Sequence, residues 1–340
     1  MSYRYLGNKS RLAEWIVNEI EKVIPRSGAI ADPMCGTASV SFELAKRGYS
    51  VVASDALVFP TLHAKARLLH DKSPEFKPFN GYLGIINEIN NLSAEEGYFF
   101  KEFSEHGNPE QHDRPRLYFS SENAGRIDAA RNFIARCHKD GNLTTLERDL
   151  LLHDLILAVN RIANIAGTYG YFRSTISAPA KKTLTLMPSE FYSFKERHSV
   201  DLGSAKEVLP RYKVDAVYLD PPYTKRQYAG NYHLLETIAV GDCPPAIGAG
   251  GLRPWKNDAS DFCYKRKVEG AFRDTIESCN AKYIFISYSE DGQINPTDLK
   301  NLLQEYGAVT CYSREYSRYR SNGGVKDGSV LEHLYRLEVK

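Results

Sequence analysis

The sequence predicts an α/β fold built on a parallel sheet, with its functional residues at the carboxyl ends of the strands. A short apolar strand over 214–219 runs into two prolines, which no strand can continue through. A strand, a turn of small residues and a helix follow one another over 29–45, and a further strand over 49–55 ends in Asp55. Open α/β sheets bind ligands at the carboxyl ends of their strands, so we expect the site there.

The turn after the 214–219 strand carries groups that suit an amino group on a flat ring. Asp220 and the carbonyl of Pro221 can each accept one hydrogen from the amine, and the ring of Tyr223 can stack on the group that carries it. Pro222 makes the turn rigid. A proline-rich turn in which Asp220 caps a helix explains the same residues, so this motif alone leaves both interpretations open.

The turn over 32–38 and Asp55 together have the pattern of a nucleotide-binding unit. Small residues let the backbone approach a ligand at the start of the following helix. Asp55 follows Gly36 by about 20 residues, the separation at which an acidic side chain accepts hydrogen bonds from ribose hydroxyls. We favour this role over the alternative, in which Asp55 only caps the next helix.

The N-terminal loop over 5–9 contains a glycine and ends in Lys9, before a helix expected over 9–23 with Ser10 as its N-cap. Such a loop can fold over a small ligand through its backbone amides and the Lys9 ammonium, although a plain turn explains it too.

Composition limits the class of protein. The 340 residues exceed the usual size of one domain, which predicts two lobes. With 44 basic and 42 acidic residues, the net charge is only +2, so any surface for a polyanion must come from local clustering. The six cysteines are scattered without a Cys-x-x-Cys pair, which argues against zinc and disulfides. We find no signal peptide or membrane span, and we expect a cytoplasmic protein.

Residues 57–195 are far more than a parallel crossover needs, which predicts an inserted lobe. Thr144 and Glu147 predict a capping box at the start of an apolar helix that runs to about Ile165. The loop after this helix contains Tyr169 and Arg173, which suit stacking on bases, although many such loops only fill the edge of a core.

The sheet is expected to resume after this lobe. Lys225 and Arg226 begin a segment that would lie over the pocket as a lid. A loop from Arg314 to Lys326 mixes cations with tyrosines, which suits a phosphate backbone but equally an exposed hairpin tip. Further elements are expected as strands at 198–204, 283–288, 309–313 and 331–339, and as a helix over 299–306 ended by Gly307.

In combination, the motifs resemble the Dam-like class of S-adenosylmethionine-dependent DNA adenine methyltransferases. The resemblance rests on motifs in this order: Tyr5-x-Gly-x-Lys9, Asp32-Pro-Met-Cys-Gly-Thr37, Asp55, Asp220-Pro-Pro-Tyr223, Arg226-Gln-Tyr-Ala-Gly-Asn-Tyr-His233 and Ile286-Ser-Tyr-Ser289. It spans nearly the whole catalytic half and covers 57–195 only loosely. The chain departs from the family pattern at Met34-Cys35-Gly36-Thr37-Ala38, where Phe-x-Gly-x-Gly is usual, and at Ser204, where an acidic residue is usual.

The resemblance implies a Rossmann-like methyltransferase sheet formed by 1–56 and 196–340, with 57–195 inserted as a mainly helical target-recognition region. It implies S-adenosyl-L-methionine as cofactor and no metal. The implied catalytic residues are Asp220, Pro221, Pro222 and Tyr223. The implied cofactor-binding residues are Tyr5, Lys9, Asp32, Pro33, Met34, Gly36, Asp55 and Asp220. The residues expected to bind DNA, because of the cations and aromatic rings in the segments described above, are Tyr169, Arg173, Lys225, Arg226, Arg318 and Arg320.

The implied activity is site-specific methylation of the exocyclic amino group of adenine. The partner would be double-stranded DNA with the target base flipped out, in a restriction-modification or epigenetic role. A cognate restriction endonuclease is a further expected partner, and the protein would act as a monomer or weak dimer.

Other functions stay open at this point. The same pocket would hold the amino group of cytosine or of an RNA base, although Asp220 before Pro-Pro favours adenine and the insertion favours DNA. A protein-glutamine methyltransferase is disfavoured, because such an enzyme would have Asn before Pro-Pro, where this chain has Asp220. An inactive nucleic-acid-binding relative is disfavoured because Lys9, Asp55 and Asp220 are all present.

Overall fold

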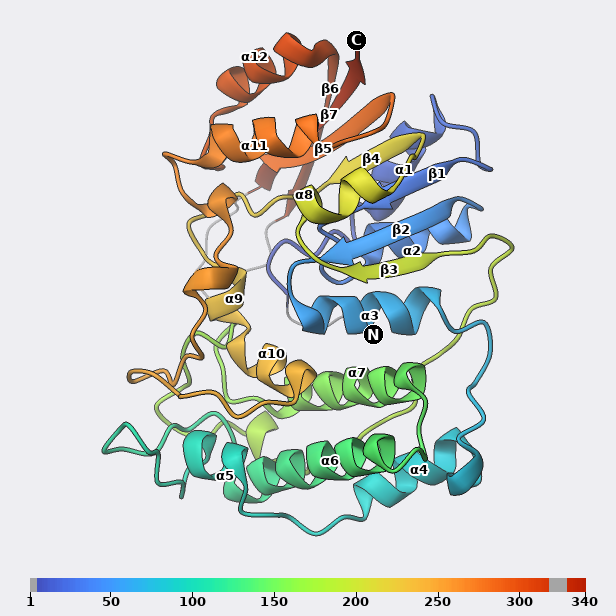
Figure 1. The fold of residues 1–340 in the computed structure, drawn as a ribbon. Helices are drawn as coiled ribbons and strands as arrows, with labels where there is room; N and C mark the ends of the chain where they lie inside the picture. The colour runs from blue at the N-terminus through green and yellow to red at the C-terminus, as the bar shows by residue number, and fades with distance from the viewer. Residues whose placement is uncertain (1–4, 318–328) are drawn as a thin grey trace. The chain divides into compact units, whose positions relative to one another are not determined.

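The computed structural model describes residues 5–317 and 329–340. These residues divide into two compact units, each formed by segments that are far apart in sequence (Figure 1). The sheet-bearing unit comprises 7–69, 194–228, 258–317 and 329–340, and the helical unit comprises 5–6, 70–193 and 229–257. No helix within the described residues is both long and apolar enough to cross a membrane.

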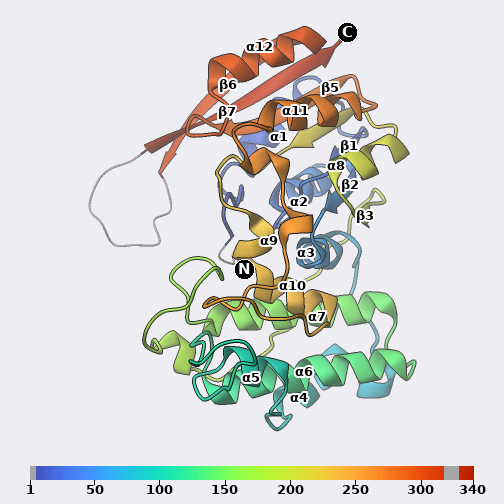
Figure 2. The same ribbon diagram turned by 60° about the vertical axis from the view of Figure 1, so that its left-hand side comes forward.

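The described residues of the sheet-bearing unit form one seven-stranded sheet of order β3-β2-β1-β4-β5-β7-β6. The pairs β3–β2, β2–β1, β1–β4 and β4–β5 are parallel, whereas β7 is antiparallel to both of its neighbours. This is a doubly wound α/β sheet closed at one edge by the long β6–β7 hairpin (Figure 2), which confirms the predicted fold class. The strands are β1 (Ala29–Asp32), β2 (Ser50–Asp55), β3 (Ser199–Leu202), β4 (Ala216–Leu219), β5 (Tyr283–Ser289), β6 (Gly307–Ser317) and β7 (Ser329–Val339).

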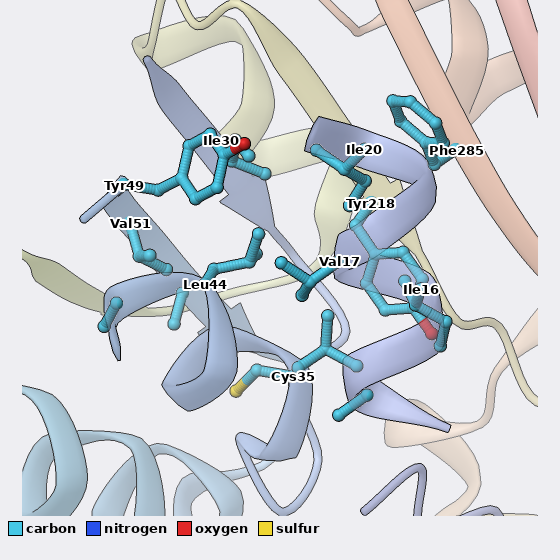
Figure 3. Close-up of a cluster of buried hydrophobic side chains, with 14 of the residues drawn as sticks. Ile16, Val17, Ile20, Ile30, Cys35, Leu44, Tyr49, Val51, Tyr218 and Phe285 are labelled. Atoms are coloured by element: carbon cyan, nitrogen blue, oxygen red, sulfur yellow. The ribbon is translucent and has the colours of Figure 1, made fainter. Parts of the chain in front are cut away.

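Both faces of this sheet are covered, because successive strand residues point to opposite sides. Ile30 and Tyr218 pack with α1 (Ala13–Glu21), α2 (Ser39–Lys46) and α3 (Val58–Leu68) on one face (Figure 3). Their neighbours Ala31 and Val217 pack on the other face. That face is covered by α8 (Ala205–Val208), η3 (Leu209–Arg211), α11 (Val268–Glu277) and α12 (Pro296–Tyr306). Two further short turns, η4 (Lys256–Asp258) and η5 (Asp261–Cys263), precede α11.

The largest differences from the expected element boundaries are at the first helix and at the last two strands. The first helix begins at Ala13 and its N-cap is Leu12, so the expectation that Ser10 caps it is wrong. The carbonyl of Lys9 instead accepts the backbone N–H groups of Leu12 and Ala13, at 2.8 Å each. The last two strands are also longer than expected, because the β6–β7 hairpin pairs from Gly307–Val339 to Ser317–Ser329. Gly307 ends α12 as predicted.

The helical unit is built around α6 (Ser121–Lys139) and α7 (Thr145–Ile162), which lie side by side. The predicted capping box of Thr144 and Glu147 is present at the start of α7. Smaller elements pack around this pair: η1 (Lys77–Phe79), α4 (Tyr82–Asn90), α5 (Tyr98–Phe103), η2 (Pro179–Lys181) and α10 (His233–Val240). The single-turn helix α9 (Tyr228–Asn231) begins at the last residue before the unit boundary.

The unit boundaries are not those expected for the insertion. Residues 57–69 belong to the sheet-bearing unit, because α3 packs on β2 and β3. Residues 229–257 belong to the helical unit, because α10 packs on α7.

Candidate active site

Three neighbouring parallel strands end beside one another at the candidate site. Asp32 ends β1, Asp55 ends β2, and Asp220 directly follows β4. Because β1 pairs with both β2 and β4 in parallel, these carboxylates lie at the same edge of the sheet. The predicted site residues of the three motifs are therefore brought to one edge.

The turn between β1 and α2 is held against the end of β2. The backbone N–H of Cys35 donates to the carbonyl of Ser54 at 2.9 Å, and that of Gly36 donates to Oδ2 of Asp55 at 3.1 Å. Gly36 has a φ of 50° and Ala38 one of 53°, a left-handed conformation that an alanine adopts at some cost. The turn is therefore shaped by hydrogen bonds that its backbone N–H groups donate to the backbone and to the Asp55 side chain of β2.

Asn8 joins the N-terminal loop to the start of α2. Its Oδ1 accepts hydrogen bonds from the hydroxyls of Thr37 and Ser39, at 3.3 and 3.1 Å, and from the backbone N–H of Ser10 at 2.9 Å. Gly7 gives this loop its curvature, since its φ is 72°. Sequence reasoning missed Asn8, because a single asparagine in a loop gives no sign of a partner about 30 residues away.

Lys9 lies between two carboxylates. Its Nζ is 3.1 Å from Oδ1 of Asp220 and 2.9 Å from Oε1 of Glu332, and only 4% of the lysine side chain is exposed. Burial acts to lower the pKa of Lys9, but the two carboxylates outweigh it and raise that pKa well above its usual value. The lysine is therefore a permanent cation at the site.

The Lys9 ammonium also lies 5.3 Å from the centre of the Tyr223 ring, which contacts Tyr288 edge-on at 6.2 Å. Both Asp220 and Tyr223 of the turn thus adjoin Lys9. Burial raises the pKa of Asp220, Lys9 lowers it and Glu332 raises it, and the balance of these effects is a pKa of about 6. Asp220 is consequently ionised at neutral pH but protonates under mildly acidic conditions.

Asp32 and Asp55 are held differently. One oxygen of Asp32 accepts a hydrogen bond from Ser41 at 2.6 Å, and burial raises the pKa of this carboxyl to about 7. The other oxygen, Oδ1, is buried and has no hydrogen-bond donor within the described parts of the chain. Asp55 accepts the backbone N–H groups of Gly36 and Leu57, at 3.1 and 3.0 Å, and burial raises its pKa to about 6.

A family model described as D12 class N6 adenine-specific DNA methyltransferase matches residues 5–302. The chain belongs to this family. Three curated relatives support the assignment and confirm the resemblance that the motifs indicated. Type II methyltransferase M.FokI of Planomicrobium okeanokoites is 31% identical over 98% of this chain and 52% of its own length.

Modification methylase StsI of Streptococcus sanguinis is 30% identical over 99% of this chain and 52% of its own length. Type II methyltransferase M.NlaIII of Neisseria lactamica is 28% identical over 98% of each chain. The chain therefore spans about half the length of the first two relatives and nearly all of the third.

Within this D12-class chain, not all expected site residues belong to the sheet-bearing unit. Pro33 is buried, and Met34 is half-buried against the core on the α11 and α12 face. Tyr5 belongs to the helical unit, where its ring stacks on that of Tyr232 with the ring centres 5.0 Å apart. Contact of Tyr5 with a cofactor stays a prediction.

Among the expected DNA contacts, the expectation that Tyr169 stacks on a base is wrong. Its side chain is 0% exposed, and its hydroxyl donates to Asn160 inside the helical unit, so it has no surface to offer a base. Arg173 is exposed, and its Nε donates to the carbonyl of Ile165 at 3.1 Å. Arg318 and Arg320 lie outside the described residues.

Lys225 and Arg226 are exposed directly after the Asp220 turn. The residue that follows them, Gln227, is buried and exchanges two hydrogen bonds with the backbone of Ser260, at 3.0 and 2.8 Å. This anchor fixes the segment that carries the two cations, and its partner lies too far along the chain for sequence reasoning to have found it.

Ser204, the second departure from the family pattern, is the N-cap of α8. Its backbone N–H and its hydroxyl both donate to the carboxylate of Glu207 at 2.8 Å. The serine is therefore a helix cap in this structure, and the acidic group that it contacts belongs to the helix that it caps.

We predict that Asp55→Ala weakens binding of S-adenosylmethionine by about 1–3 kcal/mol, the worth of a hydrogen bond to a charged group. Asp55→Asn should lose less, because an amide oxygen can still accept one backbone N–H. Isothermal titration calorimetry measures both, with Asp274→Ala, an exposed carboxylate of α11, as the control. Unchanged affinity in the alanine variant would reduce Asp55 to a structural residue that holds the β1–α2 turn.

Proposed function

We propose that this chain is a site-specific DNA methyltransferase that transfers a methyl group from S-adenosyl-L-methionine to the exocyclic amino group of adenine. The observation that carries the proposal is the turn of Asp220, Pro221, Pro222 and Tyr223 after β4, with the buried Lys9 beside both Asp220 and Tyr223. Membership of a family of adenine-specific DNA methyltransferases supports it.

The residues at the strand ends fit the cofactor. The buried Oδ1 of Asp32, which has no donor among the described residues, can accept from an ammonium group, and Gly36 lets the backbone approach closely. Asp55 accepts two backbone N–H groups but retains lone pairs for ribose hydroxyls. Lys9 would lie near the methionine end. When bound, the cofactor supplies an activated methyl group, so the protein has to provide only orientation and electrostatics.

The turn after β4 would orient the amine. Lys9 contacts Oδ1 of Asp220, so Oδ2 would accept one amino hydrogen and the carbonyl of Pro221 the other. This pair localises the lone pair of the nitrogen and aims it at the methyl carbon. Tyr223 would stack on a base flipped out of the duplex, which would hold its ring in the plane that the two acceptors require. No cysteine nucleophile takes part.

The substrate would be double-stranded DNA, and Lys225, Arg226 and Arg173, all exposed, would contact phosphates. Arg318 and Arg320 are proposed for the same role from their sequence alone. A relative is named a modification methylase, which supports a role in restriction-modification with a cognate endonuclease as partner. The protein would act in the cytoplasm as a monomer or weak dimer.

We predict that Asp220→Ala abolishes methyl transfer and keeps most of the DNA affinity, because phosphate contacts dominate binding to DNA. The test incubates the protein with labelled S-adenosylmethionine and plasmid DNA and then analyses the nucleosides. Asp274→Ala is the matched control, since its carboxylate pairs with Lys206 on the surface. Near-normal turnover of Asp220→Ala would remove the role given to Asp220.

The same assay separates the other functions. Label in cytosine would move the chain to a different amino-group methyltransferase, and label only with an RNA substrate would replace DNA by RNA. DNA binding without any transfer would make the chain an inactive relative.

We also propose that residues 57–195 choose the DNA sequence, since reading bases requires side chains in a groove and most of this region, residues 70–193, lies outside the sheet-bearing unit. Grafting 57–195 from a relative that methylates a different sequence should therefore change which adenine is methylated. Sequencing of methylated DNA measures the outcome. An unchanged site would move recognition to the carboxyl-terminal half. A second graft that also carries 229–257 tests the compact unit as the structure divides it.

A further inference from the structure

We propose that Glu332 is a positioning residue for methyl transfer. Glu332 holds Lys9 in place, and Lys9 in turn orients the carboxylate of Asp220. The inference rests on the proposed function and extends it to a residue outside the 5–302 range that the family model matches. Glu332 belongs to none of the motifs, and it reaches the site only through the topology of the sheet.

The reversed direction of β7 brings Glu332 to the site. Asp220 follows the carboxyl end of β4, and β5 runs parallel to β4. Because β7 is antiparallel to β5, the start of β7 lies at the edge where β4 and β5 end. Glu332 pairs with Ser289, the last residue of β5, and so lies at that edge. A parallel β7 would place it at the opposite edge.

Glu332 is built into the sheet, whereas Lys9 has a flexible side chain. The glutamate side chain is 0% exposed, and its Oε1 accepts the hydroxyl of Ser287 at 2.6 Å and lies 2.9 Å from Nζ of Lys9. Lysine is a point charge on a four-carbon stem and does not fix its own position. Two rigid strands, β5 and β7, therefore fix the ammonium through Glu332.

The buried charge of Lys9 also requires the carboxylates of both Asp220 and Glu332 if Asp220 is to stay in position for the substrate. Lys9 is a buried cation, and one of its two partners, Asp220, is needed to accept an amino hydrogen. A lysine held by Asp220 alone would draw that carboxylate toward itself, because nothing would oppose the attraction. With Glu332 on its other side, the ammonium contacts Oδ1 of Asp220 at 3.1 Å and is held at the same time from β7. The orientation of Asp220 thus depends on a residue that need not touch the substrate.

Among the described residues, the charged and titratable groups around Asp220 come from four places. They are Lys9 of the N-terminal loop, Asp32 of β1, Tyr218 of β4 and Glu332 of β7. Glu332 acts to raise the pKa of Asp220 and Lys9 acts to lower it. Asp220 has to be ionised to accept a hydrogen, so methyl transfer should fail on the acid side of its pKa. Removal of Glu332 should therefore shift that acid limb to lower pH, and removal of Lys9 should shift it to higher pH.

The test measures steady-state methyl transfer against pH for the unmodified protein, Glu332→Gln and Lys9→Met. Glu338→Gln is the matched control, because Glu338 is on the same strand but pairs with Lys282 on the surface. We expect Glu332→Gln to lower kcat by about 10- to 100-fold, the effect of a small misplacement of a reacting group. The KM for DNA and the affinity for S-adenosylmethionine should change less than about threefold, and Glu338→Gln should behave as the unmodified protein.

The acid limb of methyl transfer distinguishes a variant that has lost stability from one in which Lys9 and Asp220 are only misplaced. A merely structural role would lower the melting temperature and leave the acid limb in place, which would overturn the proposal. If Glu332→Gln does not fold, Ser287→Ala is the second variant, and it should give a smaller loss in kcat with unchanged KM. Normal kcat in that variant, or in a folded Glu332→Gln, would also overturn the proposal.

The unmodified protein distinguishes the two levels of inference. If it transfers no methyl group, the proposed function falls and the role of Glu332 falls with it. If it transfers methyl groups and the acid limb of Glu332→Gln is not shifted downward, only the role of Glu332 falls.

Discussion

The buried ammonium of Lys9 is the constraint on which the arrangement of the site depends. A charge with 4% of its side chain exposed has to be paired, because removing one partner of a buried ion pair typically costs about 3–5 kcal/mol. Its partners, Asp220 and Glu332, come from the end of β4 and the start of β7. The N-terminal loop that carries Lys9 can therefore take its final position only after both strands have joined the sheet. Buried ion pairs add little net stability compared with apolar residues, which favours a functional reason for this one.

Sequence reasoning succeeded where a local pattern reports a local structure. The two prolines after 214–219 predicted the end of β4, and the turn of small residues before 39 predicted the start of α2, because both are properties of a few consecutive residues. The capping box at Thr144 was predictable for the same reason. Asp55 shows the limit of this approach. Both oxygens of Asp55 accept backbone N–H groups here, an arrangement compatible with either of the two roles considered for it.

Contacts between distant segments could not be predicted. The partner of Lys9 on β7 is more than 300 residues away in sequence, and the bonds of Asn8 cross about 30 residues. For Tyr169 the sequence predicted a contact that the structure does not allow. An aromatic residue in a glycine-bearing loop suggested an exposed ring for stacking on a base, but the side chain is fully buried. The unit boundaries also depend on packing. The sequence alone places α3 in the insertion, whereas its contacts with β2 and β3 place it in the sheet-bearing unit.

The charges at the strand ends follow from these contacts and suit a cationic cofactor. Three carboxylates, those of Asp32, Asp55 and Asp220, lie at these strand ends, and burial raises the pKa of all three. A raised carboxyl pKa means that the ionised form lacks a favourable environment and gains from a nearby cation. S-adenosylmethionine, with a sulfonium and an ammonium group, would provide such a cation. After methyl transfer the sulfonium becomes a neutral thioether, so the same carboxylates would hold the product less tightly than the cofactor. The electrostatics that favour binding would then also favour release.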